Sequence, residues 1–170
     1  SDDIKLAADI DFEGATLPSV VSFKASFNGQ NFAFKNCKIT EAIFQSNEGS
    51  VKNLVLDKSC TLAPSTGQFA PIVLVNAGIV SGCVNNAPIN YSENNDDYVL
   101  IAGIVAACKR EGSLENCTNN GAIDIKCGGT KTIAPIVAGV VGASAGFVRG
   151  CVNTGDINHE VGSAALGKGG

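Results

Sequence analysis

The sequence contains no methionine and no tryptophan, and only 6% of its residues are aromatic. A core of large aromatic side chains is therefore excluded, although 45% of the 170 residues are hydrophobic. These are mostly small or β-branched residues and cysteines, and they are accompanied by 20 glycines. A chain of this length can bury roughly 70% of its unfolded surface in one domain. We therefore expect a single domain over residues 1–170, with a narrow core.

Runs of lysine or arginine are also missing, and the net charge is −4. Nucleic-acid phosphates and anionic membrane surfaces are both recognised through concentrated basic patches. The most apolar stretch, 136–148, is too short to span a bilayer. Residues 1–10 lack the segments of a secretory signal peptide, which a mature secreted chain would have lost. We expect neither a nucleic-acid partner nor direct membrane insertion.

Signatures of metal and cofactor sites are scarce as well. The chain has a single histidine and no CxxC pair, which argues against a structural zinc site. It also lacks a phosphate-binding glycine loop, a GxSxG elbow and an HExxH motif. His159 lies between Asp156 and Glu160 and could act as a general base, but it stands alone, which favours a surface histidine. We expect no cofactor and no metal.

What the chain does contain is an internal repeat. A frame of glycine, an aliphatic residue, cysteine and asparagine recurs every thirty-four residues, with a weaker first copy. The copies are GSVKNLVLDK (49–58), GIVSGCVNNA (78–87), GSLENCTNNG (112–121) and GFVRGCVNTG (146–155). An internal repeat of this length indicates stacked structural units. Short β-branched runs bounded by glycine and asparagine, with no helical stripe, indicate strands.

The sequence therefore predicts an all-β fold, a right-handed parallel β-solenoid (β-helix) of about four to five coils. We expect about three short strands per coil, with variable loops between them. For the third copy the strands are placed near 101–106, 113–118 and 122–126, with loops at 90–98 and 127–134. The chain is divided into an N-terminal cap or lead-in at 1–30, repeat coils at 31–160, and a Gly-rich tail or truncated coil at 161–170.

A corner is expected in the middle of each repeat. Leu114 and Cys117 are three residues apart, which breaks the inside–outside alternation of a strand. Asparagine and glycine enter left-handed backbone conformations most easily. These two residue types occupy the position directly before the cysteine, or before Leu54 in the first copy, at Asn53, Gly82, Asn116 and Gly150.

In such a coil, equivalent residues stack about 4.8 Å apart. Cys83, Cys117 and Cys151 would form an inward ladder, and Asn85, Asn119 and Asn153 an amide ladder. Leu54 and Cys37 are candidates to continue the cysteine ladder. A redox or metal site is the alternative, but no histidine or acid repeats beside the cysteines. Seven cysteines leave at least one unpaired, and the sequence leaves the disulfide status of Cys60, Cys108 and Cys127 open.

The repeat resembles the GLUG-motif family. The best copy combines GVVG (139–142), GFVRGC (146–151) and NTGDI (153–157), and a second combines GIVA (103–106) with GSLENC (112–117). The segments LAADID (6–11) and FNGQ (27–30) are similar to the lead-in that precedes such repeats. The resemblance implies a secreted or surface-attached β-solenoid, adhesin-like, of the kind found in gut Bacteroidetes. It implies no catalytic residues.

We therefore expect a non-catalytic extracellular or cell-surface module, a spacer within a longer chain that presents loops to a glycan or protein partner. The candidate ligand-binding residues lie in the polar insertion YSENNDDY (91–98), namely Tyr91, Asp96, Asp97 and Tyr98. A solvated loop without a ligand is the alternative interpretation. Two other functions stay open. One is a carbohydrate-active enzyme, a lyase or glycosidase, whose two carboxylates would face each other across a groove. The other is a purely structural, self-associating coil.

Overall fold

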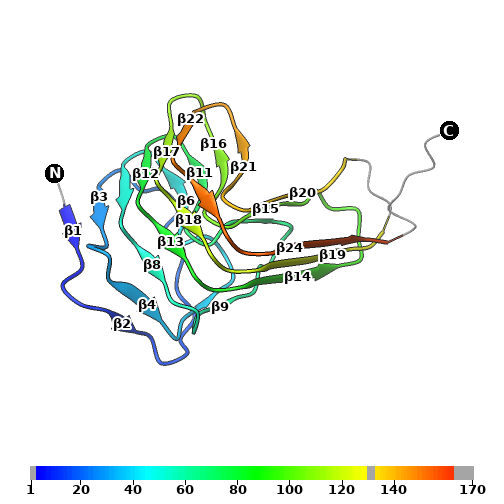
Figure 1. The fold of residues 1–170 in the computed structure, drawn as a ribbon, viewed down its shortest axis with the longest axis horizontal. Helices are drawn as coiled ribbons and strands as arrows, with labels where there is room; N and C mark the ends of the chain where they lie inside the picture. The colour runs from blue at the N-terminus through cyan, green and yellow to red at the C-terminus, as the bar shows by residue number, and fades with distance from the viewer. Residues whose placement is uncertain (1–2, 130–132, 163–170) are drawn as a thin grey trace.

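The computed structural model describes residues 3–129 and 133–162. The predicted all-β architecture is confirmed, because the described residues form a parallel β-solenoid and contain no helix (Figure 1). Each turn of the chain visits up to five sheets in the same order. We number these sheets 1 to 5 in the order in which a turn visits them.

Three complete turns contribute one strand to every sheet. They consist of β7 (Ser50–Lys52), β8 (Val55–Leu56), β9 (Thr61–Leu62), β10 (Gln68–Phe69) and β11 (Val73–Asn76); then β12 (Ile79–Ser81), β13 (Val84–Asn85), β14 (Ile89–Glu93), β15 (Leu100–Ala102) and β16 (Val105–Cys108); then β17 (Ser113–Glu115), β18 (Thr118–Asn119), β19 (Ile123–Cys127), β20 (Ile136–Ala138) and β21 (Val141–Ser144).

Incomplete turns flank these three. Before them come β1 (Asp3–Lys5) and β2 (Ile10–Asp11), then β3 (Ser26–Asn28), β4 (Ala33–Lys35), β5 (Lys38–Ile39) and β6 (Phe44–Asn47). After them come β22 (Phe147–Arg149), β23 (Val152–Asn153) and β24 (Ile157–Val161). The predicted coil number of about four to five therefore differs little from the structure.

The stacking order of the sheets follows the sequence order of the turns. Sheet 1 is β1-β3-β7-β12-β17-β22 and sheet 2 is β2-β4-β8-β13-β18-β23. Sheet 3 is β5-β9-β14-β19-β24, sheet 4 is β10-β15-β20 and sheet 5 is β6-β11-β16-β21. All pairs are parallel, and the register keeps repeat positions together, as in the column Val80, Leu114 and Val148.

The predicted mid-repeat corner is confirmed at the junction of sheets 1 and 2. Asn53, Gly82, Asn116 and Gly150 have φ values of 53°, 63°, 52° and 64°. These values lie in the left-handed region that asparagine and glycine tolerate best. The corner splits the expected strand at 113–118 into β17 and β18, and the expected strand at 101–106 is likewise divided into β15 and β16. A complete turn therefore contains five strands and not the three predicted.

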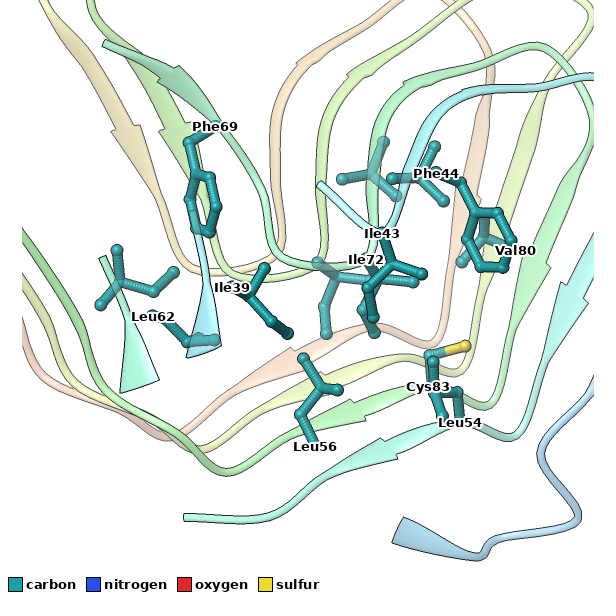
Figure 2. Packing of buried hydrophobic residues seen from close by; sticks show 14 of the residues in the cluster. Ile39, Ile43, Phe44, Leu54, Leu56, Leu62, Phe69, Ile72, Val80 and Cys83 are labelled. Atoms are coloured by element: carbon teal, nitrogen blue, oxygen red, sulfur yellow. The ribbon is translucent and has the colours of Figure 1, made fainter. Parts of the chain in front are cut away.

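The core is a thin layer of aliphatic side chains enclosed by the sheets (Figure 2). Leu54, Ile72, Val80 and Cys83 are all 0% exposed. Larger rings are concentrated in the first two turns, where Phe34 packs against neighbouring phenylalanines. In the later turns the core consists mainly of aliphatic side chains and cysteines, with Phe69 as a buried ring, which matches the low aromatic content.

The structure describes most of the expected N-terminal cap but only the first two residues of the expected C-terminal tail. Residues 1–30, expected as a cap, include β1 and β2, and these strands pair in parallel with β3 and β4 of the next turn. The tail expected at 161–170 lies outside the described residues from position 163 onward.

Candidate functional site

The asparagines of the repeat form a continuous column of side-chain hydrogen bonds in sheet 2. The Asn85 Nδ2 donates to Asn119 Oδ1 at 2.9 Å, and the Asn119 Nδ2 donates to Asn153 Oδ1 at 2.8 Å. Each amide also donates to the backbone carbonyl two residues further on, as Asn119 does to Gly121 at 2.8 Å. Asn85 and Asn119 are 0% exposed, so these bonds satisfy polar groups that water cannot reach.

Glycines on the opposite wall make room for this column. A Cβ atom added to Gly103 would lie 2.5 Å from Asn119 Cγ, and one added to Gly139 would lie 2.3 Å from Asn153 Cγ. Both distances are below any van der Waals contact. Gly103 and Gly139 are therefore required at these two positions, because any larger residue would overlap with the asparagine side chains of the column.

Cys83, Cys117 and Cys151 occupy one column at the corner between sheets 1 and 2. Their neighbours pair in register, with Val84 opposite Thr118. The Cys117 S–H donates to the backbone oxygen of Glu115 at 3.4 Å. The neighbouring Cys83 thiol and burial raise the pKa of Cys117, and burial raises the pKa of Cys151. The raised pKa values keep Cys117 and Cys151 protonated, which opposes nucleophilic chemistry. The neighbouring Cys117 thiol lowers the pKa of Cys83, but Cys83 is 0% exposed, which suits packing.

Leu54 continues this column, but Cys37 does not, so that part of the prediction is wrong. Because Ala33 pairs with Val55, the position equivalent to Leu54 in the preceding turn is Phe32. Cys37 instead lies at the next corner, between sheets 2 and 3, where Lys38 pairs with Thr61. The early turns are shorter than thirty-four residues, so the similarity of the sequence around Cys37 to the repeat did not identify the column in which Cys37 lies.

A second amide pair escaped the sequence prediction. The Asn47 Nδ2 donates to Asn76 Oδ1 at 2.8 Å, and both residues are 0% exposed. Each side chain also accepts a hydrogen bond from the backbone two residues further on, since the N–H groups of Gly49 and Gly78 donate to the Oδ1 atoms of Asn47 and Asn76. The signal was an Asn-x-Gly triplet that occurs once in each of the two early repeats.

The strongest candidate for a ligand-binding surface is a projection that we call the arm. It consists of β14, β19 and β24 of sheet 3 together with β15 and β20 of sheet 4, and Figure 1 shows these strands extending away from the remaining coil. The predicted loop at 90–98 is shorter than expected, because Ile89–Glu93 is strand β14, paired with β19 over its full length.

The four predicted ligand-binding residues lie in this arm in two different settings. Asp96 and Asp97 are exposed. Tyr91 and Tyr98 are half-buried and pack against hydrophobic clusters, and the Tyr91 hydroxyl approaches Gly67 of the preceding turn. Burial, with the charges of Glu93 and Asp97, raises the pKa of Tyr91. The tyrosines anchor the arm, and the acids are its exposed groups.

The outer face of sheet 3 adds a polar surface beside these acids. Asn90 and Ser92 of β14 alternate outward, as do Asp124 and Lys126 of β19. A shallow groove of about 250 Å³ is lined by these four residues and Tyr91. Asn158 donates to the Asp124 Oδ1 at 2.7 Å, and Lys126 lies 3.8 Å from Glu160. The face therefore offers amide, hydroxyl, carboxylate and ammonium groups in fixed positions.

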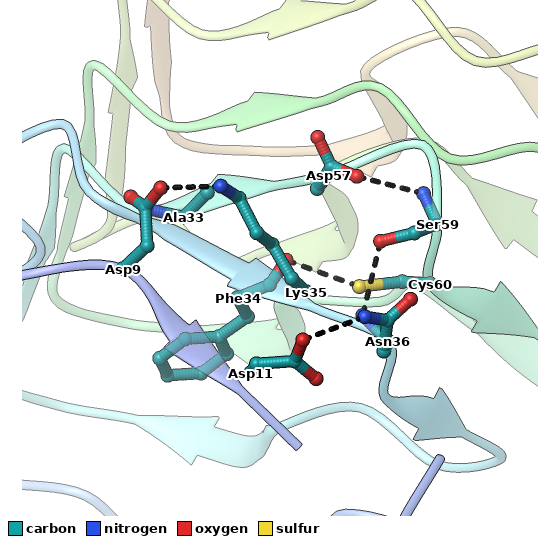
Figure 3. Close-up of polar contacts among 9 residues, drawn as sticks. All are labelled: Asp9, Asp11, Ala33, Phe34, Lys35, Asn36, Asp57, Ser59 and Cys60. Carbon is teal, nitrogen blue, oxygen red and sulfur yellow. Dashed lines mark hydrogen bonds and ion pairs between the residues drawn. The ribbon is translucent and has the colours of Figure 1, made fainter. Parts of the chain in front are cut away.

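A second groove, of about 420 Å³, lies near the N-terminal end at the corner between sheets 2 and 3. Asp11 and Glu13 line it from the first turn, and the later turns contribute Lys38, Ser59 and Thr61. Both oxygens of the Asp11 carboxylate are occupied, one by the Glu13 N–H at 2.8 Å and the other by the Asn36 Nδ2 at 2.8 Å (Figure 3). Asp11 and Glu13 thus come from one segment of the chain, whereas glycoside cleavage needs two carboxylates that face each other across a groove.

Glycoside cleavage would need two facing carboxylates, but Asp9 and Glu160 lie in the first and the last turn. Asp9 lies 2.6 Å from Lys35, and the hydrogen bonds from Lys35 and the Ala33 N–H lower the pKa of Asp9 (Figure 3). A general acid needs the opposite shift. On β24, His159 and Glu160 are consecutive strand residues and point to opposite faces of the sheet.

Comparisons with known proteins give no match: no protein-family model, no curated protein and no solved structure is significantly similar to the chain. Within 3–129 and 133–162, no group of three or more His, Cys, Asp or Glu residues could hold a metal ion. No helix long and apolar enough to cross a membrane occurs in the same residues.

Proposed function

We propose that the chain is a non-catalytic extracellular surface module, adhesin-like, whose arm contacts a glycan. The observation that carries the proposal is the outward polar face of β14 and β19, together with the exposed Asp96 and Asp97 in the loop that directly follows β14. Hydroxyl-rich ligands are bound through such fixed donors and acceptors. The resemblance of the repeat to the GLUG-motif family supports a secreted or cell-surface location.

A rigid scaffold with a projecting element is well suited to presentation. The arm is held by the parallel pairing of β14, β19 and β24 and by the two half-buried tyrosines at its base. Functional residues are commonly found on projections from rigid frameworks. The proposal therefore places recognition on the arm and assigns the remaining turns the role of a spacer.

A glycan array with the purified chain tests this proposal. We expect the Asp96→Ala/Asp97→Ala variant to lose the signal that the wild type gives. Asp3→Ala/Glu111→Ala removes the same charge from exposed positions outside the arm and should keep it. If neither the wild type nor the variants bind any glycan, or if all three bind equally, recognition by these arm acids is ruled out.

A second candidate function, self-association, is favoured by the last turn. Val148 and Ile157 occupy inward columns, yet they are 40% and 42% exposed. The strands β1 and β22 terminate the same sheet, as do β2 and β23, so a second copy of the chain could continue both sheets. The proposed occupant of this end is therefore another copy of the same chain.

Light scattering over a range of concentrations tests for this association. Val148→Lys should abolish a rise in mass with concentration, because the lysine would place a charge where the inner side chains meet. Ile79→Lys is the control, because Ile79 is 42% exposed but lies in a middle turn. A constant monomer mass for the wild type would exclude this second function.

A further inference from the structure

We propose that Cys37 and Cys60 form a disulfide that covalently joins two successive turns of the solenoid. The two sulfur atoms lie 2.9 Å apart in the reduced chain. Both residues are buried, at 2% and 4% exposure, so their side chains face each other inside the wall of the coil. This inference is independent of the proposed glycan recognition.

The backbone holds the pair in a suitable position. Strand β5 pairs in parallel with β9, with Lys38 opposite Thr61, and Cys37 and Cys60 directly precede these residues. The Thr61 N–H donates to the Cys37 carbonyl oxygen at 2.8 Å. Neighbouring strands are about 4.8 Å apart, which falls within the Cα separations of about 4.4–6.8 Å that disulfides span. The bond therefore requires little movement of the backbone.

The pair is also accessible to a small oxidant. Cys37 lines the groove of about 420 Å³ described above, together with Asn36 and Ser59. Figure 3 shows Cys60 close to the same two residues, with its S–H donating to the Phe34 carbonyl oxygen at 3.2 Å. A reagent that enters the groove therefore meets Cys37, whose sulfur lies 2.9 Å from that of Cys60.

The chemistry is thiol–disulfide exchange with a low-molecular-weight disulfide such as oxidised glutathione. The Cys37 S–H donates to Cys60, and this hydrogen bond lowers the pKa of Cys60 to about 7. The Cys60 thiolate attacks one sulfur of the reagent, breaks its S–S bond and releases one thiol. Cys37 then loses its proton and attacks the mixed disulfide, which releases the second thiol. Two cysteine thiols are oxidised and one small disulfide is reduced to two thiols.

The repeat cysteines provide a contrast within the same molecule. Cys83 and Cys117 also stack in adjacent turns, but their S–H groups donate to the backbone oxygens of Ser81 and Glu115. Both are 0% exposed. This complete burial keeps a small oxidant away from them, so we expect them to stay reduced under the same treatment.

The test is to incubate the folded chain with oxidised glutathione at pH 8 and to count thiols under denaturing conditions. We expect the number of thiols to fall from the seven of the sequence to five. Digestion with trypsin and chymotrypsin then identifies the bond by mass, because cleavage after Phe69 separates Cys60 from Cys83. The melting temperature should rise on the order of 5–10 °C on oxidation.

Variants assign the effect to this pair. Cys37→Ala and Cys60→Ala should each abolish the rise on oxidation, whereas Cys83→Ala should keep it. The mass measurement on the wild type stands even if an alanine variant fails to fold. Seven thiols after oxidation, glutathione attached without an internal bond, or a bond between other cysteines would each overturn the proposal.

Discussion

The third repeat and the last turn carry the same residue frame but differ in burial. Leu114 and Ile123 are 0% exposed, whereas their equivalents Val148 and Ile157 are 40% and 42% exposed. The backbone conformation is the same at both corners, with positive φ at Asn116 and Gly150. A turn therefore acquires its shape from its own residues but its burial from the turn that follows, as nearest-neighbour models of repeat proteins assume.

The first turns differ again, because aromatic rings fill them. Phe12 and Phe34 pack edge to face with ring centroids 5.0 Å apart, and Phe23 and Phe44 are 4.6 Å apart. Such side chains cover much more area than the valine, isoleucine and cysteine of the later turns. The two ends thus differ in the size of their side chains, but both leave inner residues exposed, since Ile4 and Ile10 of the first turn are 47% and 37% exposed.

The largest expected difference between the middle and the end concerns a buried charge. Cys117→Asp should lower the free energy of unfolding by about 4 kcal/mol or more, because the carboxylate would be buried without a partner. Cys151→Asp, at the partly exposed equivalent, should cost much less. Urea denaturation of the two variants measures the difference. Equal effects would show that Cys117 does not face inward or that the last turn is covered in solution.

The amide column should show a smaller difference of the same sign. Asn119→Ala removes the acceptor of Asn85 and the donor to Gly121, which leaves buried polar groups unpaired and should cost about 2–3 kcal/mol. Asn153→Ala removes one acceptor of Asn119, but Asn153 is itself exposed and its place can be taken by water, so this variant should cost about 1 kcal/mol less than Asn119→Ala. The comparison is again made by urea denaturation. A larger loss at Asn153 would contradict the assignment of the last turn as the open end.

The smallest expected effect lies at the first turn and depends on pH. The pKa of Asp9 is lowered in the folded chain, so the stabilisation from its pairing with Lys35 is present above the unfolded carboxyl pKa and is lost as the pH falls through the folded pKa. Asp9→Asn should therefore reduce the melting temperature slightly at pH 6 and not at pH 2. Both partners are about 40% exposed, so salt should weaken the effect.

A matched control for this measurement is Asp3→Asn, which removes one carboxylate from the same end of the molecule. Its melting temperature should follow the wild type at both pH values more closely than that of Asp9→Asn. If the two variants behave alike, the effect reflects net charge and not the ion pair.

The fold was predictable because the regular repeats place equivalent residues at a constant spacing along the chain. Glycine or asparagine before the cysteine indicated the corner, and the equal spacing of Asn85, Asn119 and Asn153 indicated stacking. The early turns were harder, because turns of unequal length shift the register. Cys37 therefore stacks with Cys60 and not with the Cys83 column, which only the pairing of β5 with β9 reveals.

The candidate site was predictable only in part. The polar insertion was visible as YSENNDDY, but its division into a strand and a short loop depends on pairing with β19, which local composition does not encode. The groove beside Asp11 was not foreseen, since three turns contribute to it. Surfaces made by stacking distant segments require the register to be known first.

The amide column also has a direction. Each carboxamide passes one hydrogen to the turn that follows it, and at Asn153 one N–H is already used on the Gly155 carbonyl. By analogy with Asn119, the other is oriented onward along the axis. An added turn continues this series of side-chain hydrogen bonds only if it brings an acceptor to that point. A second copy that continued sheet 2 would bring Ile10 to this column, so its contact would depend on backbone pairing and apolar burial and not on the amide series.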